Sequence, residues 1–404
     1  MRKQYIAIAG VLIGMLVTFF VYEGCASFRV GEVVVPSAKD AEEGYALVAP
    51  YRVDTAPHET SEGMVYLLNK KGAVLHTWHT PAPVLVAHLM DDGSLYVAMT
   101  EALSQSEHPN AGTTGIIQKL SWGGDVLFEH KDSYMMIDFE VLPNGNITYM
   151  RWSKTPFWYG MQARGTAVPH GVWANELVEI DPEGKEVWSW RLQEHVSPTV
   201  ARDSFVPSDD FSHTNSVRYI QENPITHTEA YLVSARHLST IYLIERNTGN
   251  VLWESKKGLL AFQHDATLLP NGHILAFDNG FAREGVSVLA SRALEFDMSE
   301  QQIVWQYDGG MTGTGKAQFA TSIMGGAQRL LNGDTLITLS VPNRVIEVTE
   351  NGDVAWEYVY TKRDEDGASR MLFKTHLYDG ATASWRKYII LPELSNNLFC
   401  TAFN

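Results

Sequence analysis

Two histidines, an asparagine and an arginine form the set of residues in this sequence that is best suited to chemistry: His213, Asn215, Arg236 and His264. An imidazole can serve as a nucleophile, a general acid–base or a metal ligand. A guanidinium presents planar donors that suit a tetrahedral oxyanion, and an amide adds a neutral donor. The combination favours transfer of an anionic group with charge on its equatorial oxygens, because the protein then has mainly to position and neutralise that group.

Other chemistries find less support in the sequence. A metal site needs three or more converging ligands, and Arg236 beside them would repel a cation, so we expect neither a metal nor a cofactor. The set includes no carboxylate pair suited to glycoside hydrolysis. The sequence also has no Gly-rich phosphate loop and no serine nucleophile elbow.

A repeated strand pattern must position these side chains. A strand, a tight turn and a pattern close to Gly-x-Val-x-aromatic recur six times, with copies ending at His76, Phe128, Trp188, Trp253, Trp305 and Trp356. A second pair of strands lies between copies, with its turn at Asp91–Gly93, Pro143–Gly145, Pro270–Gly272 or Asn332–Gly333. Apolar and polar residues alternate on both sides of the turns, which predicts hairpins. Four strands in each of six periods predict an all-β, six-bladed β-propeller.

The innermost strands of a propeller line its central channel, so equivalent positions of different repeats converge there. His264 lies just before the Leu-Pro-Asn-Gly turn of its repeat, and His213 occupies the corresponding place in the third repeat. Asn215, two residues after His213, faces the same side of a strand. Arg236 ends the next strand, and strand alternation predicts that His237 points the opposite way.

At these residues the sequence resembles the arylsulfotransferase family, whose members are PAPS-independent enzymes built on a six-bladed propeller. The resemblance is carried by Ser212–Val217, by Ser234–Tyr242, and by Gln263–Thr267 followed by Phe277–Gly280. The weaker blade repeats extend it over roughly residues 60–380. The family carries a sulfuryl group on a histidine, in a ping-pong reaction between a phenolic sulfate donor and a phenolic acceptor.

The resemblance also implies roles for the residues. His264 would carry the sulfuryl group, and Arg236 would neutralise it. His213 and Asn215 would bind the sulfuryl oxygens or the bridging phenolic oxygen, and His213 is also a candidate general acid for the leaving phenolate.

One position departs from the family pattern. Members commonly carry a histidine before the Asp of the second repeat, where this sequence has Ile137. A polar contributor is therefore missing, and His88, in the first repeat, is the candidate to replace it. Thr321 and Ser322, in the fifth repeat, are further substrate-binding candidates on position alone.

The departure at Ile137 keeps a second hypothesis open, in which the propeller serves as a binding or assembly module of a membrane complex. The aromatic insertion Trp152–Trp173 either caps the site or decorates the surface. A third hypothesis is a quinoprotein-like propeller, but the residues that bind calcium and stack on its cofactor are not evident. The Trp residues that end four hairpins are interpreted as blade packing, and Asp278 and Asn279 as turn formers.

The N-terminal segment predicts a membrane anchor. Arg2 and Lys3 precede the uncharged run Tyr5–Tyr22, whose 18 residues are close to the roughly 20 that span a bilayer. Positive charge before the run predicts an N-terminal transmembrane helix that leaves the propeller on the extracytoplasmic, periplasmic side. A cleaved signal peptide and a lipoprotein acylated at Cys25 are the alternatives. The predicted domains are an anchor or signal segment at 1–25, a tether at 26–57 and the propeller at 58–404.

Composition limits the partners. The net charge of −16 argues against a nucleic acid, because phosphate binding needs a basic surface. A small anionic substrate remains compatible, since a local pocket can oppose the global charge. Membrane contact through residues 5–22 leaves room for membrane protein partners. The two cysteines, Cys25 and Cys400, have no spacing that suggests a metal site.

Overall fold

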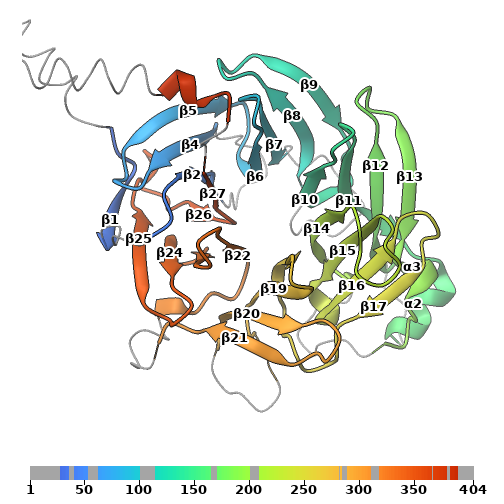
Figure 1. The fold of residues 1–404 in the computed structure, drawn as a ribbon. Coiled ribbons are helices and arrows are strands. Elements are labelled where there is room, and N and C mark those ends of the chain that lie inside the picture. The colour runs from blue at the N-terminus through green and yellow to red at the C-terminus, as the bar shows by residue number, and fades with distance from the viewer. Residues whose placement is uncertain are drawn as a thin grey trace, which may run out of the picture.

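The computed structural model describes residues 28–35, 41–52, 62–100, 114–164, 171–200, 209–281, 283, 289–310, 318–365, 367–379 and 383–389. Over these residues the chain forms six antiparallel sheets of four or five strands set around a common centre (Figure 1), and one further two-stranded sheet. The predicted all-β, six-bladed propeller is confirmed.

Blades 2 to 5 are four-stranded meanders in which each strand pairs with the next along the chain. Blade 2 is β6 (Val84–Leu89), β7 (Leu95–Thr100), β8 (Gly115–Leu120) and β9 (Val126–Lys131). Blade 3 is β10 (Met135–Val141), β11 (Ile147–Lys154), β12 (Trp173–Ile180) and β13 (Glu186–Arg191), with the helices α2 (Phe157–Arg164) and α3 (Leu192–His195). Blade 4 is β14 (Thr214–Ile220), β15 (Ala230–Ala235), β16 (Thr240–Glu245) and β17 (Val251–Glu254), with the 3-10 helix η1 (Arg236–Leu238) between β15 and β16. Blade 5 is β18 (His264–Leu268), β19 (His273–Asp278), β20 (Arg292–Asp297) and β21 (Ile303–Tyr307).

The two ends of the chain close the ring. Blade 1 combines the C-terminal strand β27 (His376–Tyr378) with β2 (Tyr45–Val48), β4 (Gly63–Asn69) and β5 (Val74–Thr80). Blade 6 is β22 (Gly326–Arg329), β23 (Thr335–Leu339), β24 (Arg344–Val348) and β25 (Val354–Tyr360), to which β1 (Gly31–Val35) adds a fifth strand. β26 (Met371–Leu372) pairs with β3 (Pro50–Tyr51).

The tether predicted over residues 26–57 is therefore wrong in its described part. β1, β2 and β3 all fall within that range and pair with strands near the C-terminal end of the chain. β1 and β3 have their strand partners more than 300 residues away, whereas β2 pairs both with the similarly distant β27 and with the nearby β4. Most of this pairing is long-range, and a local sequence pattern does not reveal it.

The tryptophans that end the outer strands join neighbouring blades. The indole Nε1–H of Trp253 donates to Met298 O of the next blade at 2.9 Å, and that of Trp305 donates to Glu350 O at 3.0 Å. Trp356 closes the ring by donating to Lys70 O of blade 1 at 2.9 Å. These bonds satisfy indole groups that would otherwise be costly to bury. The interpretation of these tryptophans as blade packing is confirmed.

The hydrophobic core follows the same plan. It consists of six apolar clusters, and each is built mainly from the facing strands of two adjacent blades. The inner strands themselves are in contact around the centre, β14 with β10 and with β18, and β18 with β22. Side chains at the start of these strands are consequently brought together from different repeats.

The predicted transmembrane segment, residues 5–22, lies outside the described residues, as do Cys25 and Cys400. Among the helices that the structure describes, none has the length and apolar character needed to cross a membrane.

Candidate active site

His264 is held by hydrogen bonds at both ring nitrogens. It begins the innermost strand β18 and is 2% exposed. Its Nδ1 lies 2.6 Å from Oδ1 of Asn279, whose Nδ2 donates to the carbonyl oxygens of Thr321 and Met324 at 3.0 and 2.9 Å. Since these carbonyls can only accept, the Asn279 oxygen must face the ring, and Nδ1 carries the proton. Nε2 is left with its lone pair and accepts the Met324 N–H at 3.2 Å.

His213 is oriented by a carboxylate that the sequence analysis did not single out. Asp210 accepts the backbone N–H of His213 at 3.0 Å and its Nδ1–H at 2.6 Å. The same carboxylate lies 3.4 Å from Nδ1 of His237, whose ring stacks on that of His213 with centroids 4.7 Å apart. Asp210 thus fixes the tautomer of His213, with the proton on Nδ1. The Nε2 lone pair of His213 points away from Asp210.

The sequence predicts Arg236 as the last residue of strand β15, but in the structure Arg236 lies outside that strand. It begins η1, where strand alternation no longer holds. The guanidinium Nη1 lies 2.9 Å from Nε2 of His237, and its Cζ lies 4.7 Å from the ring centroid of Phe262. The prediction that His237 points away from Arg236 is therefore wrong, because both side chains belong to one contact chain that ends at Asp210.

Asn215 joins blade 4 to the residue before His264. Its Nδ2 donates to Gln263 O at 2.8 Å, and its buried Oδ1 has no partner among the described residues. In this orientation the unpartnered group, Oδ1, can only accept a hydrogen bond. It therefore suits a phenolic hydroxyl, which can donate, better than a sulfuryl oxygen, which cannot. The structure thus brings His213 and Asn215 to the start of β14 and His264 to the start of β18, with Arg236 beside His213, directly after the end of β15.

The other candidate residues are placed differently. Thr321 is linked to His264 through Asn279, because its carbonyl oxygen accepts a hydrogen bond from the Asn279 amide. Ser322 is half-buried and makes no hydrogen bond with the described residues. His88 lies elsewhere, with Nε2 at 3.2 Å from Phe139 O and its ring stacked 5.4 Å from that of His376. His88 therefore makes no contact that would replace the histidine absent at Ile137.

Ile137 lies in an apolar part of the core. It is 5% exposed and shares a cluster with Phe373, and Met324 packs against that cluster from outside. The Phe373 ring is 6.0 Å from that of His264, and the Met324 amide caps its Nε2. The wall on this side of His264 is apolar.

The aspartates that follow positions 137 and 264 hold neighbouring blades together. Asp138 accepts the N–H of Val217 in the next blade at 3.2 Å, and Asp265 accepts the N–H of Ala327 at 3.2 Å. Arg218 bridges both carboxylates. This cross-blade contact explains why an Asp can remain after Ile137 although no His precedes it.

Backbone strain concentrates around the site. Eight described residues other than glycine have a positive φ, and five of them border the site: His213, Ser239, Phe262, Asp265 and Met324. Each such conformation costs about 1–3 kcal/mol and persists only where surrounding contacts enforce it. Such outliers cluster at functional sites, so the backbone supports the same location as the side chains.

Burial keeps the imidazoles neutral. Desolvation, and then the charge of Arg236, hold the pKa of His264 well below its ordinary value of 6.5. Desolvation also lowers the pKa of His213 to about 4, although Asp210 opposes the shift. At neutral pH both histidines are therefore uncharged, while His213 and His237 hold the pKa of Asp210 well below its usual range.

This burial predicts a stability that depends on pH. Burial lowers the pKa values of His88 and His376 as well, that of His376 to about 4. The unfolded chain binds protons at these histidines below pH 6.5 and the folded chain does not, so stability falls between pH 6.5 and 4. The expected slope is about 1.4 kcal/mol per pH unit for each imidazole. The Glu140 carboxyl, with a pKa that burial raises to about 7, offsets one of the four. Urea unfolding at pH 7, 6 and 5 measures the slope, and a flat profile would contradict it.

Asn279 gives a second prediction, because it sets the tautomer of His264. In Asn279→Asp the carboxylate still accepts from Nδ1 but cannot donate to Thr321 O and Met324 O. We expect a raised pKa of His264 and a loss of roughly 1–3 kcal/mol of stability from the unpaired carbonyls. Nitrogen-15 NMR of the imidazole and thermal unfolding check both, with the exposed turn variant Asn144→Asp as control, because that side chain only accepts a hydrogen bond. A His264 pKa equal to that of the parent would show that Asn279 does not hold the ring.

One group in the described part of the chain could hold a metal ion. Asp210, His213 and His237 place ligand atoms within 4.8 Å of one another. However, both Nδ1 atoms face the carboxylate as donors, and Arg236 binds the remaining nitrogen of His237. A cation would have to displace two protons beside a guanidinium, so the residues fit a hydrogen-bond chain better than a metal site.

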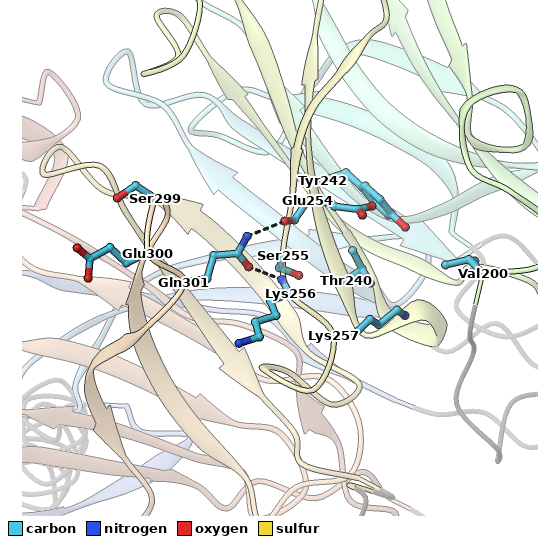
Figure 2. A pocket seen from close by; sticks show the side chains of 10 residues that line it. All are labelled: Val200, Thr240, Tyr242, Glu254, Ser255, Lys256, Lys257, Ser299, Glu300 and Gln301. Atoms are coloured by element: carbon cyan, nitrogen blue, oxygen red, sulfur yellow. Dashed lines mark hydrogen bonds between the residues drawn. The ribbon is translucent and has the colours of Figure 1, made fainter.

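Two described cavities lie outside this group of residues. Figure 2 shows the first, of about 510 Å³, where Gln301 of blade 5 bonds to Glu254 O and to the amide of Lys256 in blade 4. It is lined by none of the four converging residues, and lies at the junction of two outer hairpins. The second, of about 840 Å³, lies in blade 3 and includes Trp152, whose ring is 6.2 Å from that of His213.

The fold and the site together define a class of protein. It is a six-bladed propeller with two neutral histidines at the start of adjacent innermost strands and an arginine beside one of them. The model of the family described as arylsulfotransferase (ASST) matches residues 114–361, which is 248 of the 404 residues. The chain belongs to the arylsulfotransferase family.

Three similar solved structures are distant matches, each with a TM-score below 0.5. A protein of unknown function from Bacteroides caccae is 12% identical, with 83% of this chain and 98% of that chain covered and a TM-score of 0.49. A streptogramin B lyase is 13% identical, with coverage of 86% and 97% and a TM-score of 0.45. The Dos1 propeller is 10% identical, with coverage of 85% and 76% and a TM-score of 0.40. No curated protein matches the chain.

Proposed function

We propose that this protein transfers a sulfuryl group from a phenolic sulfate to a phenolic acceptor through a covalent intermediate on His264. The observation that carries the proposal is the state of that ring. Asn279 keeps the proton on Nδ1, and burial keeps the ring neutral, so Nε2 keeps a lone pair that can attack sulfur once the Met324 amide has withdrawn. Membership of the arylsulfotransferase family supports the same chemistry.

The first half-reaction forms the intermediate. Nε2 of His264 attacks sulfur, the bond between sulfur and the phenolic oxygen breaks, and both of its electrons leave with the phenolate. Arg236 supplies the positive charge that stabilises the oxygens during transfer. The positive charge that develops on the imidazole is delocalised toward Nδ1, where Asn279 accepts the hydrogen bond.

The second half-reaction regenerates free His264. The acceptor's phenolic oxygen attacks sulfur while Nε2 of His213 takes the phenolic proton, and the bond between sulfur and His264 breaks. A pKa of about 4 makes His213 a base rather than an acid at neutral pH. The proton then passes to solvent or to the phenolate released before. Asn215 Oδ1, which has no partner among the described residues, accepts the hydrogen bond of the acceptor's hydroxyl in this scheme.

The Met324 amide must withdraw before the reaction starts, because it occupies the Nε2 lone pair. Met324 has a φ of +59° and precedes Gly325, with a φ of +97°. A strained turn of this kind can exchange conformations at modest cost. We propose that the donor displaces this amide from Nε2.

Steady-state kinetics test the proposal. With an aryl sulfate donor and a phenol acceptor, we expect double-reciprocal plots that are parallel, as a ping-pong mechanism requires. Intersecting plots would indicate a ternary complex and would exclude the intermediate. A folded protein without any transfer would reject the proposal.

We further propose that residues 5–22 hold the propeller at the extracytoplasmic face of a membrane. The support is the uncharged run after Arg2 and Lys3. Fractionation of cells expressing the full chain and a chain lacking residues 1–25 tests this. The full chain should stay with alkaline-washed membranes and be open to external protease in spheroplasts.

A second candidate function is a binding module of a membrane complex. It is favoured by the apolar wall of Ile137 and Phe373 and by the amide that caps His264. Recovery of a stable partner from solubilised membranes, together with absence of transfer, would support it over the enzyme.

A further inference from the structure

The 840 Å³ cavity of blade 3 is built around aromatic side chains. Tyr134, Trp152, Trp158 and Trp173 line it, and the rings of Tyr134 and Trp173 are stacked 5.9 Å apart. Its volume lies within the range of small-molecule sites in proteins. Stacked and edge-on aromatic contacts favour a ligand that is itself a flat ring.

Trp158 is held in place although it is 56% exposed. It belongs to α2, and the next residue, Tyr159, is fully buried against Phe211 with ring centroids 5.2 Å apart. The Tyr159 hydroxyl also donates to Val196 O at 2.9 Å. This anchoring presents an indole to the cavity from a fixed helix, which lowers the entropy cost of binding.

The charges around the cavity cancel. Three cations line it, Arg151, Lys154 and Arg191, together with three acids, Asp132, Glu176 and Glu194. Glu176 is paired with Arg151 at 3.1 Å and with Arg191 at 3.4 Å. A balanced rim of donors and acceptors suits a neutral ring that carries hydroxyl groups better than a sulfate ion.

The cavity adjoins the candidate active site. It is lined by residues at the end of β11 and the start of β12, the same end of the propeller at which β14 starts beside His213. The Trp152 ring lines the cavity and contacts His213 edge-on at 6.2 Å. The Trp152 indole therefore contacts both the cavity and His213, which places the cavity next to the candidate active site.

We propose that this cavity binds one ring of an extended, multi-ring phenolic acceptor while another ring presents its hydroxyl group beside His213. The inference rests on the proposed sulfuryl transfer and specifies the acceptor class. A single-ring phenol fills only the site at His213, and an acceptor with two or more linked phenolic rings occupies both.

Direct binding and turnover of resveratrol, which has two phenolic rings, and of phenol test the inference with Trp158→Ala. We expect the Kd and KM for resveratrol to rise roughly tenfold, with kcat and all values for phenol unchanged. The control is Phe157→Ala, which removes a neighbouring ring that is 77% exposed and does not line the cavity.

The outcomes separate the two proposals. The cavity's role would be overturned if Trp158→Ala and Phe157→Ala changed the Kd and KM for resveratrol equally, or if Trp158→Ala weakened resveratrol and phenol equally. It would also be overturned if the parent protein did not bind resveratrol. Binding of resveratrol that depends on Trp158 without any sulfuryl transfer would retain the aromatic site and reject the transfer reaction.

Discussion

Replacing His264 with alanine is expected to abolish sulfuryl transfer, with a loss of about 10⁴-fold or more in kcat. The substitution removes the Nε2 lone pair that attacks sulfur in the proposed reaction, together with the ring that Asn279 and Met324 hold in place. The effect is measured as the rate of sulfuryl transfer from an aryl sulfate to phenol, monitored through the donor phenolate that is released.

The control for this prediction is His79→Ala, which removes an exposed imidazole from β5. His264→Gln serves as a second variant, because its side-chain amide can still pair with Asn279 or Met324. Thermal unfolding verifies that both His264 variants fold. Retention of more than a tenth of the parental kcat in a folded His264 variant would contradict the assignment.

Replacing Arg236 with alanine is expected to lower kcat by about 10²–10³-fold, the usual cost of removing a preorganised group that stabilises transition-state charge. Arg236→Lys keeps the charge but loses the planar donors, so it should restore only part of the rate. The exposed Arg363→Ala is the control.

The pH dependence of the reaction distinguishes an electrostatic role of Arg236 from a purely structural one. Its charge is the second-largest influence that lowers the pKa of His264, after burial. Arg236→Ala should therefore raise that pKa and move the acid limb of the first half-reaction to higher pH. A lower kcat with an unmoved pH profile would place Arg236 outside the electrostatic reach of His264.

Local patterns in the sequence were sufficient for the repeated part of the fold. The turns at Gly145 and Gly272 have the positive φ that glycine allows, and the alternation around them marks hairpins. The closure of the ring depended on pairing between β2 and β27, which are distant in sequence and short. No local signal identifies such strands, so the tether prediction failed.

The sequence predicted only those residues of the candidate site that belong to the repeats. His213 and His264 follow from repeat alignment, because equivalent positions of innermost strands converge. Asp210 lies beyond the reach of that argument, since its segment has no strand pattern, and Asn279 has the sequence context of a turn former. Their roles arise from contacts between segments. His237 was placed wrongly because η1 interrupts the strand.

The central claim is that His264 becomes sulfated, and rapid quenching at alkaline pH followed by peptide mass spectrometry tests it most directly. With donor alone, we predict an acid-labile sulfuryl adduct on His264 that disappears when a phenol acceptor is added. The adduct should be absent from His264→Ala and present in His79→Ala. A protein that transfers sulfuryl groups but carries no adduct on His264, or carries it on another residue, would contradict the account.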